Sequence, residues 1–204
     1  MRFAAVALLC VPVVLIPRAH AQAAAGPPVY TVSLETSKGN IDVEVHRDWA
    51  PIGADRFREL VTRGYFHDNR FFRVVAGRWA QFGINGTPAV ASAWRVRTIP
   101  DDPRRGSNVR GTMAFAFAVP NGRTTQVYIA LSDLSATQDE QGFAPFARVV
   151  RGMDVADRLN AEYGENSGSG IRAGRQQPLF DGGNAYLDRE FPRLDRVVRA
   201  RVIP

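Results

Sequence analysis

The stretch RFFRVVAGRWAQFG at residues 70–83 places a cation inside an apolar segment and an amide eight residues later. The apolar residues around Arg73 predict a β-strand over residues 71–75, and a charged side chain in such a strand has two interpretations. Arg73 could extend from an edge strand to water, which is the commoner use of an arginine in this setting. Alternatively, it is a fixed cation on the wall of an apolar ligand site, with Gln81 nearby. This stretch alone leaves both interpretations open.

A second stretch, FARVVRG at residues 146–152, repeats the Phe-x-Arg-Val-Val-x-Gly pattern of residues 71–77. Seven residues are too few to indicate an internal structural repeat. No glutamine follows Arg148, and the chain runs on into a predicted helix. We therefore interpret Arg148 as a surface residue of a strand.

Outward from these stretches, alternating and helical patterns predict a mainly β fold. Residues 29–45 alternate around Lys38-Gly39-Asn40 and predict a β-hairpin, and a helix is expected to begin at Pro51 and end at Gly64. The segment 83–110 predicts a long surface loop with little regular structure. Further strands are expected over 112–119, 125–131, 143–150 and 195–203, with a short helix over 153–160. Two helices, many strands and no βαβ alternation favour a closed antiparallel sheet with helical caps.

The N-terminal residues predict export. An apolar run over residues 3–16 follows Arg2 and leads to Ala19-His20-Ala21, a pattern typical of a cleavable secretory signal and too short to span a bilayer. We expect a signal peptide over 1–21, a linker over 22–28 and one domain over 29–204 with a glycine-rich insertion at 164–183. The expected location is the periplasm or the exterior. Cys10 is the only cysteine, so the mature chain would have no thiol and no disulfide.

Charge and motif content argue against several other functions. The chain has 26 basic and 20 acidic residues, and its arginines are scattered among acids without a basic stripe, so we expect no nucleic-acid binding. His46 and His67 lie in no recognisable ligand pattern, so no metal site is expected. Ser132-Asp133 has no nearby histidine and no Gly-x-Ser-x-Gly turn, which leaves a serine hydrolase without support.

Four segments match one known family together, in order and in spacing. Any one of them alone would be a weak signal. They are FRVV at 72–75 followed by Gly77 and Gln81, RGTMAFA at 110–116, PN at 120–121 with TQVYI at 125–129, and GFAPFARVVRGMD at 142–154. On these segments, residues 29–160 resemble the cyclophilins, which are peptidyl-prolyl cis/trans isomerases, and especially their bacterial members.

This resemblance implies a fold and a set of site residues. The implied fold is a closed eight-stranded antiparallel β-barrel capped by two α-helices, with the substrate groove on the outside of the barrel wall. At matching positions, Arg73 would be the catalytic arginine and Gln81 a groove amide of the catalytic pair, which is placed to hold Arg73. No cofactor and no metal is implied. The matched substrate-binding positions are Trp79, Ala116, Phe117, Gln126, Tyr128 and Phe143.

The chemistry implied for Arg73 is physically reasonable. Rotation about an X-Pro bond breaks amide resonance and is slow without a catalyst. As the amide twists, the prolyl nitrogen regains its lone pair, so a positioned guanidinium donor would stabilise the twisted form more than the planar forms. Arginine suits this role because it stays charged and presents its donors in a fixed geometry.

Some pocket positions depart from the family pattern. Arg78 stands where a phenylalanine is usual, and Gln138 stands near the position of a pocket leucine. Trp79, Tyr128 and Phe143 replace a methionine, a phenylalanine and a histidine, respectively. We expect Arg78 either to narrow the proline pocket or to bend outward and leave the apolar contact to Trp79. We therefore hypothesise that Arg78 makes the isomerase activity reduced or altered relative to the family.

The sequence supports one main function and one alternative. The main function is prolyl isomerisation during the folding of exported proteins, by a monomer whose partners are proline-containing peptides and unfolded proteins. The alternative is a non-catalytic module or chaperone that uses the same groove to hold proline segments. A small-molecule enzyme on the same scaffold would need an acid–base pair, and we find none. No contact with the membrane is expected beyond an uncleaved signal.

Overall fold

A computed structural model describes residues 27–168 and 175–204 of the chain. The expected signal peptide and most of the expected linker lie outside the described residues. Within them, nine strands form one antiparallel sheet in the order β3-β9-β1-β2-β8-β6-β7-β5-β4. The strands are β1 (Val29–Thr36), β2 (Gly39–His46), β3 (Asn69–Arg70), β4 (Arg73–Val75), β5 (Trp79–Phe82), β6 (Thr112–Phe115), β7 (Val127–Ala130), β8 (Pro145–Arg151) and β9 (Arg196–Ile203).

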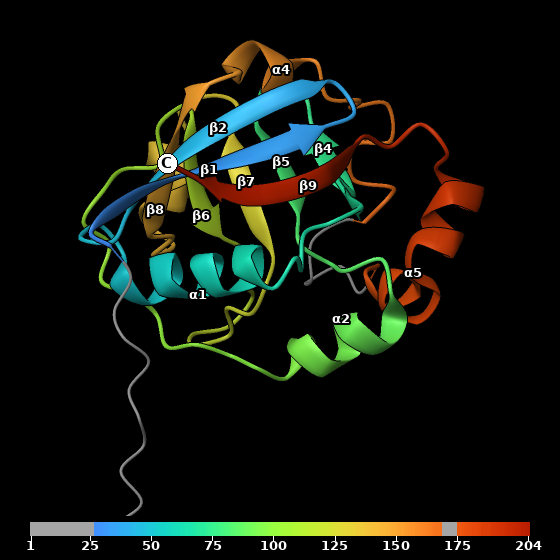
Figure 1. Cartoon of the computed structure of the whole chain (residues 1–204), viewed down its shortest axis with the longest axis horizontal. Coiled ribbons are helices and arrows are strands. Elements are labelled where there is room, and N and C mark those ends of the chain that lie inside the picture. Colours follow the sequence, from blue (N-terminus) through green and yellow to red (C-terminus); the bar gives the residue numbers. More distant parts are fainter. Residues whose placement is uncertain (1–26, 169–174) are drawn as a thin grey trace, which may run out of the picture.

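The two end strands of the sheet, β3 and β4, are neighbours in the sequence, so the sheet has to curl round on itself. Only Phe71 and Phe72 separate β3 from β4, and Figure 1 shows the strands wrapped around a common interior. The mainly β class and the antiparallel pairing are confirmed. The count differs from the expected eight strands, and no strand pairing joins β3 to β4 in the described part of the chain. Phe71, between the two strands, is fully buried in the main core.

Phenylalanine rings fill the interior of the curled sheet. Phe57 from the first helix contacts Phe66 and Phe146, with ring centroids 5.5 and 5.0 Å apart. Six phenylalanines are fully or almost fully buried in this one cluster: Phe57, Phe66, Phe71, Phe82, Phe115 and Phe146. Together with the buried aliphatic side chains of the same cluster, these rings supply the main driving force for folding.

Strand β6 follows the expected alternation but ends early. Met113 and Phe115 point into the main core, whereas Ala114 lies in a separate cluster on the other face. Regular pairing stops after Phe115, so Phe117 does not continue the core face as predicted. Its ring instead packs on Phe143, with centroids 4.5 Å apart. β7 and β8 likewise differ from the predicted limits by one or two residues at each end.

Five helices accompany the sheet in the described residues, rather than two. They are α1 (Pro51–Thr62), α2 (Pro88–Arg95), α3 (Ser135–Gln138), α4 (Met153–Asp157) and α5 (Gln177–Glu190). α1 begins at Pro51 as expected, and the buried carboxylate of Asp102 accepts the backbone N–H groups of Ile52 and Gly53 at its N-terminus. α4 is shorter than the predicted helix over 153–160.

The prediction of an irregular loop over 83–110 was wrong at α2. Pro88 begins this helix, and Ala91 and Trp94 are buried on one side of it. α2 packs on α5, which lies beside it in Figure 1. Ala91 shares a small apolar cluster with Phe180 of α5. The eight residues of α2 are too few to show a clear helical pattern, and its packing partner α5 is distant in the sequence. The helix was therefore missed.

The predicted glycine-rich insertion at 164–183 is only partly irregular. Residues 169–174 lie outside the described residues, but α5 begins at Gln177, well inside the predicted insertion. Gly183 interrupts α5 with φ 55°, a backbone conformation that favours glycine. In the described ranges, no helix is both long and apolar enough to cross a membrane.

Candidate active site

Strand pairing aligns Arg73 and Gln81. The tight connection through Gly77, with φ 67°, turns β4 back onto β5, and the register places residue 73 directly opposite residue 81. Arg73 Nη1 donates to Gln81 Oε1 at 3.0 Å. The separation of eight residues seen in the sequence is therefore the span of a short hairpin. It brings the cation and the amide together as predicted.

A row of amides extends from this pair across the sheet surface. Gln81 Nε2 donates to Gln126 Oε1 at 2.8 Å, and Gln126 Nε2 donates to Gln176 Oε1 at 2.9 Å. The three glutamines are each at most 4% exposed. Each amide thus has its orientation fixed by its neighbour, and the row ends with an oxygen acceptor held at Arg73. Gln176 was not predicted, because it lies inside the segment read as an insertion.

Arg73 lies on an edge strand but is held by several partners. Its side chain is only 18% exposed. The guanidinium carbon lies 4.6 Å from the centroid of the Trp79 ring, within cation–π distance. Nε and Nη2 donate to the two carboxylate oxygens of Glu165 at 2.9 and 2.7 Å. The interpretation of Arg73 as a fixed cation beside an apolar wall therefore agrees with the structure better than an arginine extended to water.

The apolar wall is built from the residues that flank the amide row. Tyr128 pairs with Gln81 in the register of β7 and β5, and its ring contacts Phe143 with centroids 5.7 Å apart. Trp79 and Phe143 are half-buried, so part of each ring is open to solvent. The cluster comprises buried Ala114, Tyr128, Ala130 and Leu134, with Trp79, Ala116 and Phe143 packed against it. All the predicted aromatic positions therefore lie together.

Two loop residues that sequence reasoning missed hold this wall in place. The Tyr128 hydroxyl donates to Asn108 Oδ1 at 2.7 Å, and Asn108 Nδ2 donates to the Phe143 carbonyl at 2.8 Å and to Asp139 Oδ1 at 2.7 Å. Burial raises the pKa of Tyr128, so its hydroxyl keeps its proton and remains a donor. Burial alone would raise the pKa of Asp139, but hydrogen bonds from Ser107 and Asn108 outweigh it and lower that pKa.

The departures from the family pattern have distinct positions. Arg78 is exposed, and its guanidinium carbon stacks 4.5 Å from the Trp79 ring centroid instead of entering the cluster. Gln138 lies at the end of α3 and is half-buried, while Leu134 supplies the buried aliphatic side chain of the wall. Sequence reasoning considered Gln138 near the pocket leucine and missed Leu134.

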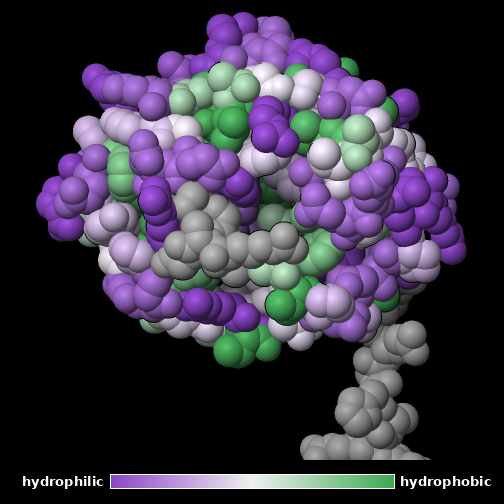
Figure 2. Space-filling model, turned by 180° about the vertical axis from the view of Figure 1, so that it is seen from behind, coloured by the Kyte–Doolittle hydropathy of each residue, from purple (hydrophilic) through white to green (hydrophobic). Residues whose placement is uncertain are grey.

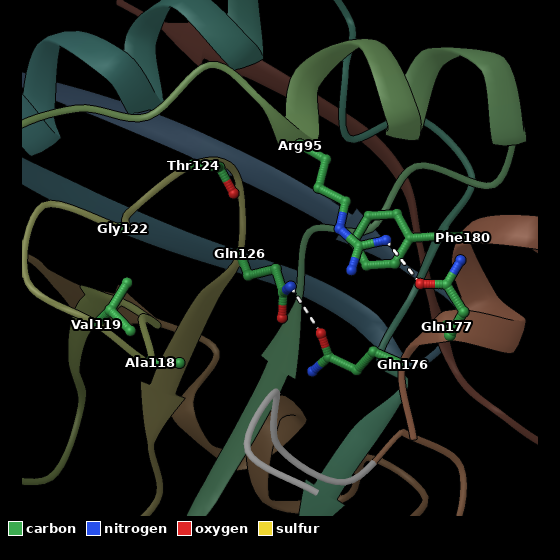
Figure 3. Close-up of a pocket in the computed structure, with 9 residues that line it drawn as sticks. All are labelled: Arg95, Ala118, Val119, Gly122, Thr124, Gln126, Gln176, Gln177 and Phe180. Carbon is green, nitrogen blue, oxygen red and sulfur yellow. Dashed lines mark hydrogen bonds between the residues drawn. The ribbon is translucent and has the colours of Figure 1, made fainter. Parts of the chain in front are cut away.

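A cavity of about 320 Å³ lies beside Gln126, at the end of the amide row away from Arg73. In Figure 3, Arg95 of α2 and Phe180 of α5 lie across the cavity from Ala118 and Val119. The Arg95 guanidinium carbon is 4.2 Å from the centroid of the Phe180 ring. The lining residues are Arg95, Ala118, Val119, Gly122, Thr124, Gln126, Gln176, Gln177 and Phe180. In Figure 2 the side of the molecule away from the view of Figure 1 has a central hollow with hydrophobic surface in it and hydrophilic residues around it.

The arrangement offers polarising donors next to an apolar surface. Apart from the Glu165 carboxylate paired with Arg73, the polar groups along the amide row are a guanidinium and primary amides, which do not act as acids or bases near neutral pH. Within residues 27–168 and 175–204, no cluster of three or more His, Cys, Asp or Glu side chains could hold a metal ion. A site of this kind suits a reaction without bond cleavage, in which a polar group changes its charge distribution.

Comparison with known proteins agrees with this chemistry. Residues 31–177 match the model of the cyclophilin type peptidyl-prolyl cis-trans isomerase family. A peptidyl-prolyl cis-trans isomerase of Acinetobacter baylyi is 32% identical over 63% of this chain and 70% of its own length. The peptidyl-prolyl cis-trans isomerase A of Dickeya dadantii is also 32% identical, over 67% of this chain and 74% of its own length.

Solved structures show the same fold at low identity. A cyclophilin type peptidyl-prolyl cis-trans isomerase of Cryptosporidium parvum has a TM-score of 0.62 at 16% identity, covering 86% of this chain and 98% of its own. The structure of that protein in the presence of the dipeptide Ala-Pro gives a TM-score of 0.61 at 17% identity, covering 85% of this chain and 99% of its own. On the family match and the relatives above, this chain belongs to the cyclophilin type peptidyl-prolyl cis-trans isomerase family.

Proposed function

We propose that this protein accelerates cis/trans rotation about X-Pro bonds, with Arg73 as the group that stabilises the twisted amide. The observation that carries the proposal is the position of the Arg73 guanidinium, held on Gln81 beside the apolar wall of Trp79, Tyr128 and Phe143. A proline ring against that wall would bring its amide nitrogen to the guanidinium. The rest of the peptide would run along the amide row.

The rate enhancement would come from differential stabilisation of the transition state. The barrier to rotation is about 20 kcal/mol, and it arises from the loss of amide resonance. In the twisted form the nitrogen carries a lone pair, which accepts a hydrogen bond that the planar form accepts poorly. A donor fixed in advance by Gln81 does not have to be reorganised when the lone pair appears. No covalent step is needed.

The partners of this activity would be proline-containing segments of unfolded or partly folded proteins. We also propose that these proteins are exported ones, met in the periplasm or outside the cell, because residues 1–21 have the pattern of a secretory signal. A monomer suffices for this function, since one chain contributes every residue of the wall and of the amide row.

A non-catalytic module that binds proline segments is the second candidate. It is favoured by one observation, the Glu165 carboxylate that already occupies two donors of Arg73. Exchange spectroscopy by NMR on a short Ala-Pro-Phe peptide with this protein separates the two functions, because it reports rotation and binding together. Faster cis/trans exchange supports the isomerase. Shifted peptide resonances at the uncatalysed exchange rate contradict it and favour the binding module.

A further inference from the structure

The partner of Arg73 comes from a segment 92 residues further along the chain. Glu165 lies in residues 162–168, which we call the acidic arm. Its two carboxylate oxygens accept from Arg73 Nε at 2.9 Å and from Nη2 at 2.7 Å. Two parallel hydrogen bonds of this kind fix the relative orientation of the guanidinium and the carboxylate. The acidic arm thus places the Glu165 carboxylate on Arg73, the residue proposed to stabilise the twisted amide.

The acidic arm is anchored on its N-terminal side. The Tyr163 ring packs edge-on against Phe191, with centroids 5.2 Å apart, and its hydroxyl accepts the backbone N–H of Arg193 at 3.3 Å. Glu162 forms an ion pair with the Arg193 side chain. The segment after α5 therefore fixes the start of the arm, two residues before Glu165.

The arm is anchored again two residues after Glu165. The Ser167 hydroxyl donates to the carbonyl oxygen of Phe72 at 2.8 Å, and Ser167 is 1% exposed. Gly168 packs so closely on Phe72 that a Cβ there would lie 2.5 Å from a ring carbon. Phe72 directly precedes Arg73. The backbone on both sides of Glu165 is therefore tied down, and the carboxylate is presented to Arg73 by the fold of the arm.

The ion pair with Glu165 reduces the number of hydrogen-bond donors that Arg73 can present to a substrate. A guanidinium has five N–H donors. Glu165 accepts one from Nε and one from Nη2, and Gln81 accepts one from Nη1, so the Nε/Nη2 edge is filled and only two of the five donors, one on each Nη, remain. The carboxylate also neutralises the positive charge that would stabilise the twisted amide. A peptide amide carries only partial charges and cannot share that edge with a carboxylate.

We propose that Glu165 is a built-in competitor, which occupies Arg73 in the free protein and is displaced when a proline peptide binds. This inference rests on the proposed function of Arg73. The contact is suited to displacement, because the Glu165 side chain is 47% exposed and water can solvate the carboxylate as soon as it leaves. Solvent-accessible ion pairs are weak, so the competition should raise KM about two- to five-fold.

The test compares Glu165→Gln with a matched control, Glu190→Gln. Glu190 is 44% exposed and pairs with Arg189 at the end of α5, so the control makes the same charge change on a carboxylate of similar exposure away from Arg73. The substrate is an Ala-Pro-Phe peptide blocked at both ends, which carries no charge that Glu165 could repel. NMR exchange gives kcat and KM, and titration gives the dissociation constant. Circular dichroism verifies that both variants are folded.

Competition makes a specific pattern of results. We expect Glu165→Gln to lower KM and the dissociation constant about two- to five-fold while kcat stays the same, because the Glu165 carboxylate has already left Arg73 in the bound state. The wild-type KM should approach that of the variant as salt rises from roughly 0.01 to 0.5 M, since salt screens the ion pair. Glu190→Gln should match the wild type at each salt concentration.

Other results would overturn the inference in distinguishable ways. A fall in kcat for Glu165→Gln would make Glu165 a positioning residue for Arg73, and an unchanged KM would show that the arm does not compete. If no variant accelerates exchange but Glu165→Gln tightens peptide binding, the competition stands and the isomerase function fails. If folded protein neither accelerates exchange nor binds the peptide, both are wrong.

Discussion

Residues 71–77 and 146–152 have the same Phe-x-Arg-Val-Val-x-Gly pattern, and much of their structure is the same. Phe71 and Phe146 are both fully buried in the main core. Each stretch forms a strand that ends near a glycine of positive φ, 67° at Gly77 and 83° at Gly152. The pattern therefore describes a strand anchored by a buried ring and ended at a glycine of positive φ, which leads to a hairpin turn at Gly77 and to helix α4 at Gly152.

The arginines of the two stretches differ in their surroundings. The Arg73 side chain is 18% exposed and contacts Gln81, Trp79 and Glu165. The Arg148 side chain is 54% exposed and pairs with Glu44 on the neighbouring strand β2, with Nη2 2.8 Å from Oε1. Arg148 is a surface strand residue, as predicted. The local sequence determines that each stretch forms a strand. Whether the arginine of that strand is held in a site depends on its contacts with residues from other segments.

The largest effects should come from the rings that the two stretches share. Phe71→Ala and Phe146→Ala each leave a cavity in the core, and each should lower the free energy of unfolding by about 3–5 kcal/mol. Urea denaturation measures this. Val150→Ala, at a position 50% exposed, serves as the control and should change stability by less than about 0.5 kcal/mol. A loss below about 1 kcal/mol at either phenylalanine would contradict a shared core.

Substitution of the glycine that ends each stretch should lower the free energy of unfolding by different amounts. Each requires left-handed backbone, which costs an alanine about 1–2 kcal/mol. A Cβ on Gly152 would also lie 2.1 Å from the carbonyl oxygen of Asn40, whereas a Cβ on Gly77 would meet nothing within 4 Å. Gly152→Ala should therefore destabilise the protein clearly more than Gly77→Ala in the same urea experiment. Equal losses would show that the Asn40 contact is relieved by a small backbone shift.

The partners of the two arginines should differ in their effect on turnover. Gln81→Ala removes the acceptor that holds Arg73, and loss of one hydrogen bond to a charged group should lower kcat about tenfold. KM should rise as well, because Gln81 belongs to the amide row along which the peptide is proposed to run. Glu44→Gln removes the charge of the partner of Arg148 and should leave both constants unchanged. NMR exchange on an Ala-Pro-Phe peptide measures both. A Gln81→Ala enzyme with wild-type kcat would refute the positioning role.

The smallest effect is expected at Arg78. Its guanidinium is exposed and stacks on Trp79, so Arg78→Phe removes a cation–π contact worth about 0.5–1 kcal/mol at an exposed site. Turnover of the same peptide should change by less than about fivefold. A larger gain would mean that Arg78 narrows the proline pocket, which was the other expectation from the sequence.

Most of the site follows from short-range sequence, and the rest depends on distant segments. Gln81 lies one short hairpin from Arg73, so spacing and resemblance together identified the pair. Glu165 and Gln176 come from a segment that the sequence presents only as glycine-rich, without a pattern to say where it folds back. Asn108 and Asp139 lie in loops and act through the Tyr128 hydroxyl and the Phe143 carbonyl, which no local motif reveals.

The strand count shows the same limit. The sequence predicted the hairpin of β1 and β2 and the closing strand β9 closely, because their alternation is regular. β3 has two residues and β4 has three, which is too short for any periodicity. α2 is a helix whose buried side rests on α5, so its stability depends on packing that is not encoded within residues 88–95.

The most direct test of this account compares Arg73→Ala with Arg148→Ala in one exchange experiment. Both substitutions remove an arginine from the same position of the same seven-residue pattern. Arg73→Ala should lower kcat/KM about 10²- to 10³-fold, the usual effect of removing a fixed donor from a developing charge. Arg148→Ala should stay within about twofold of the wild type, the size expected for losing an exposed ion pair. Equal activities of the two variants would contradict the assignment of the reaction to Arg73.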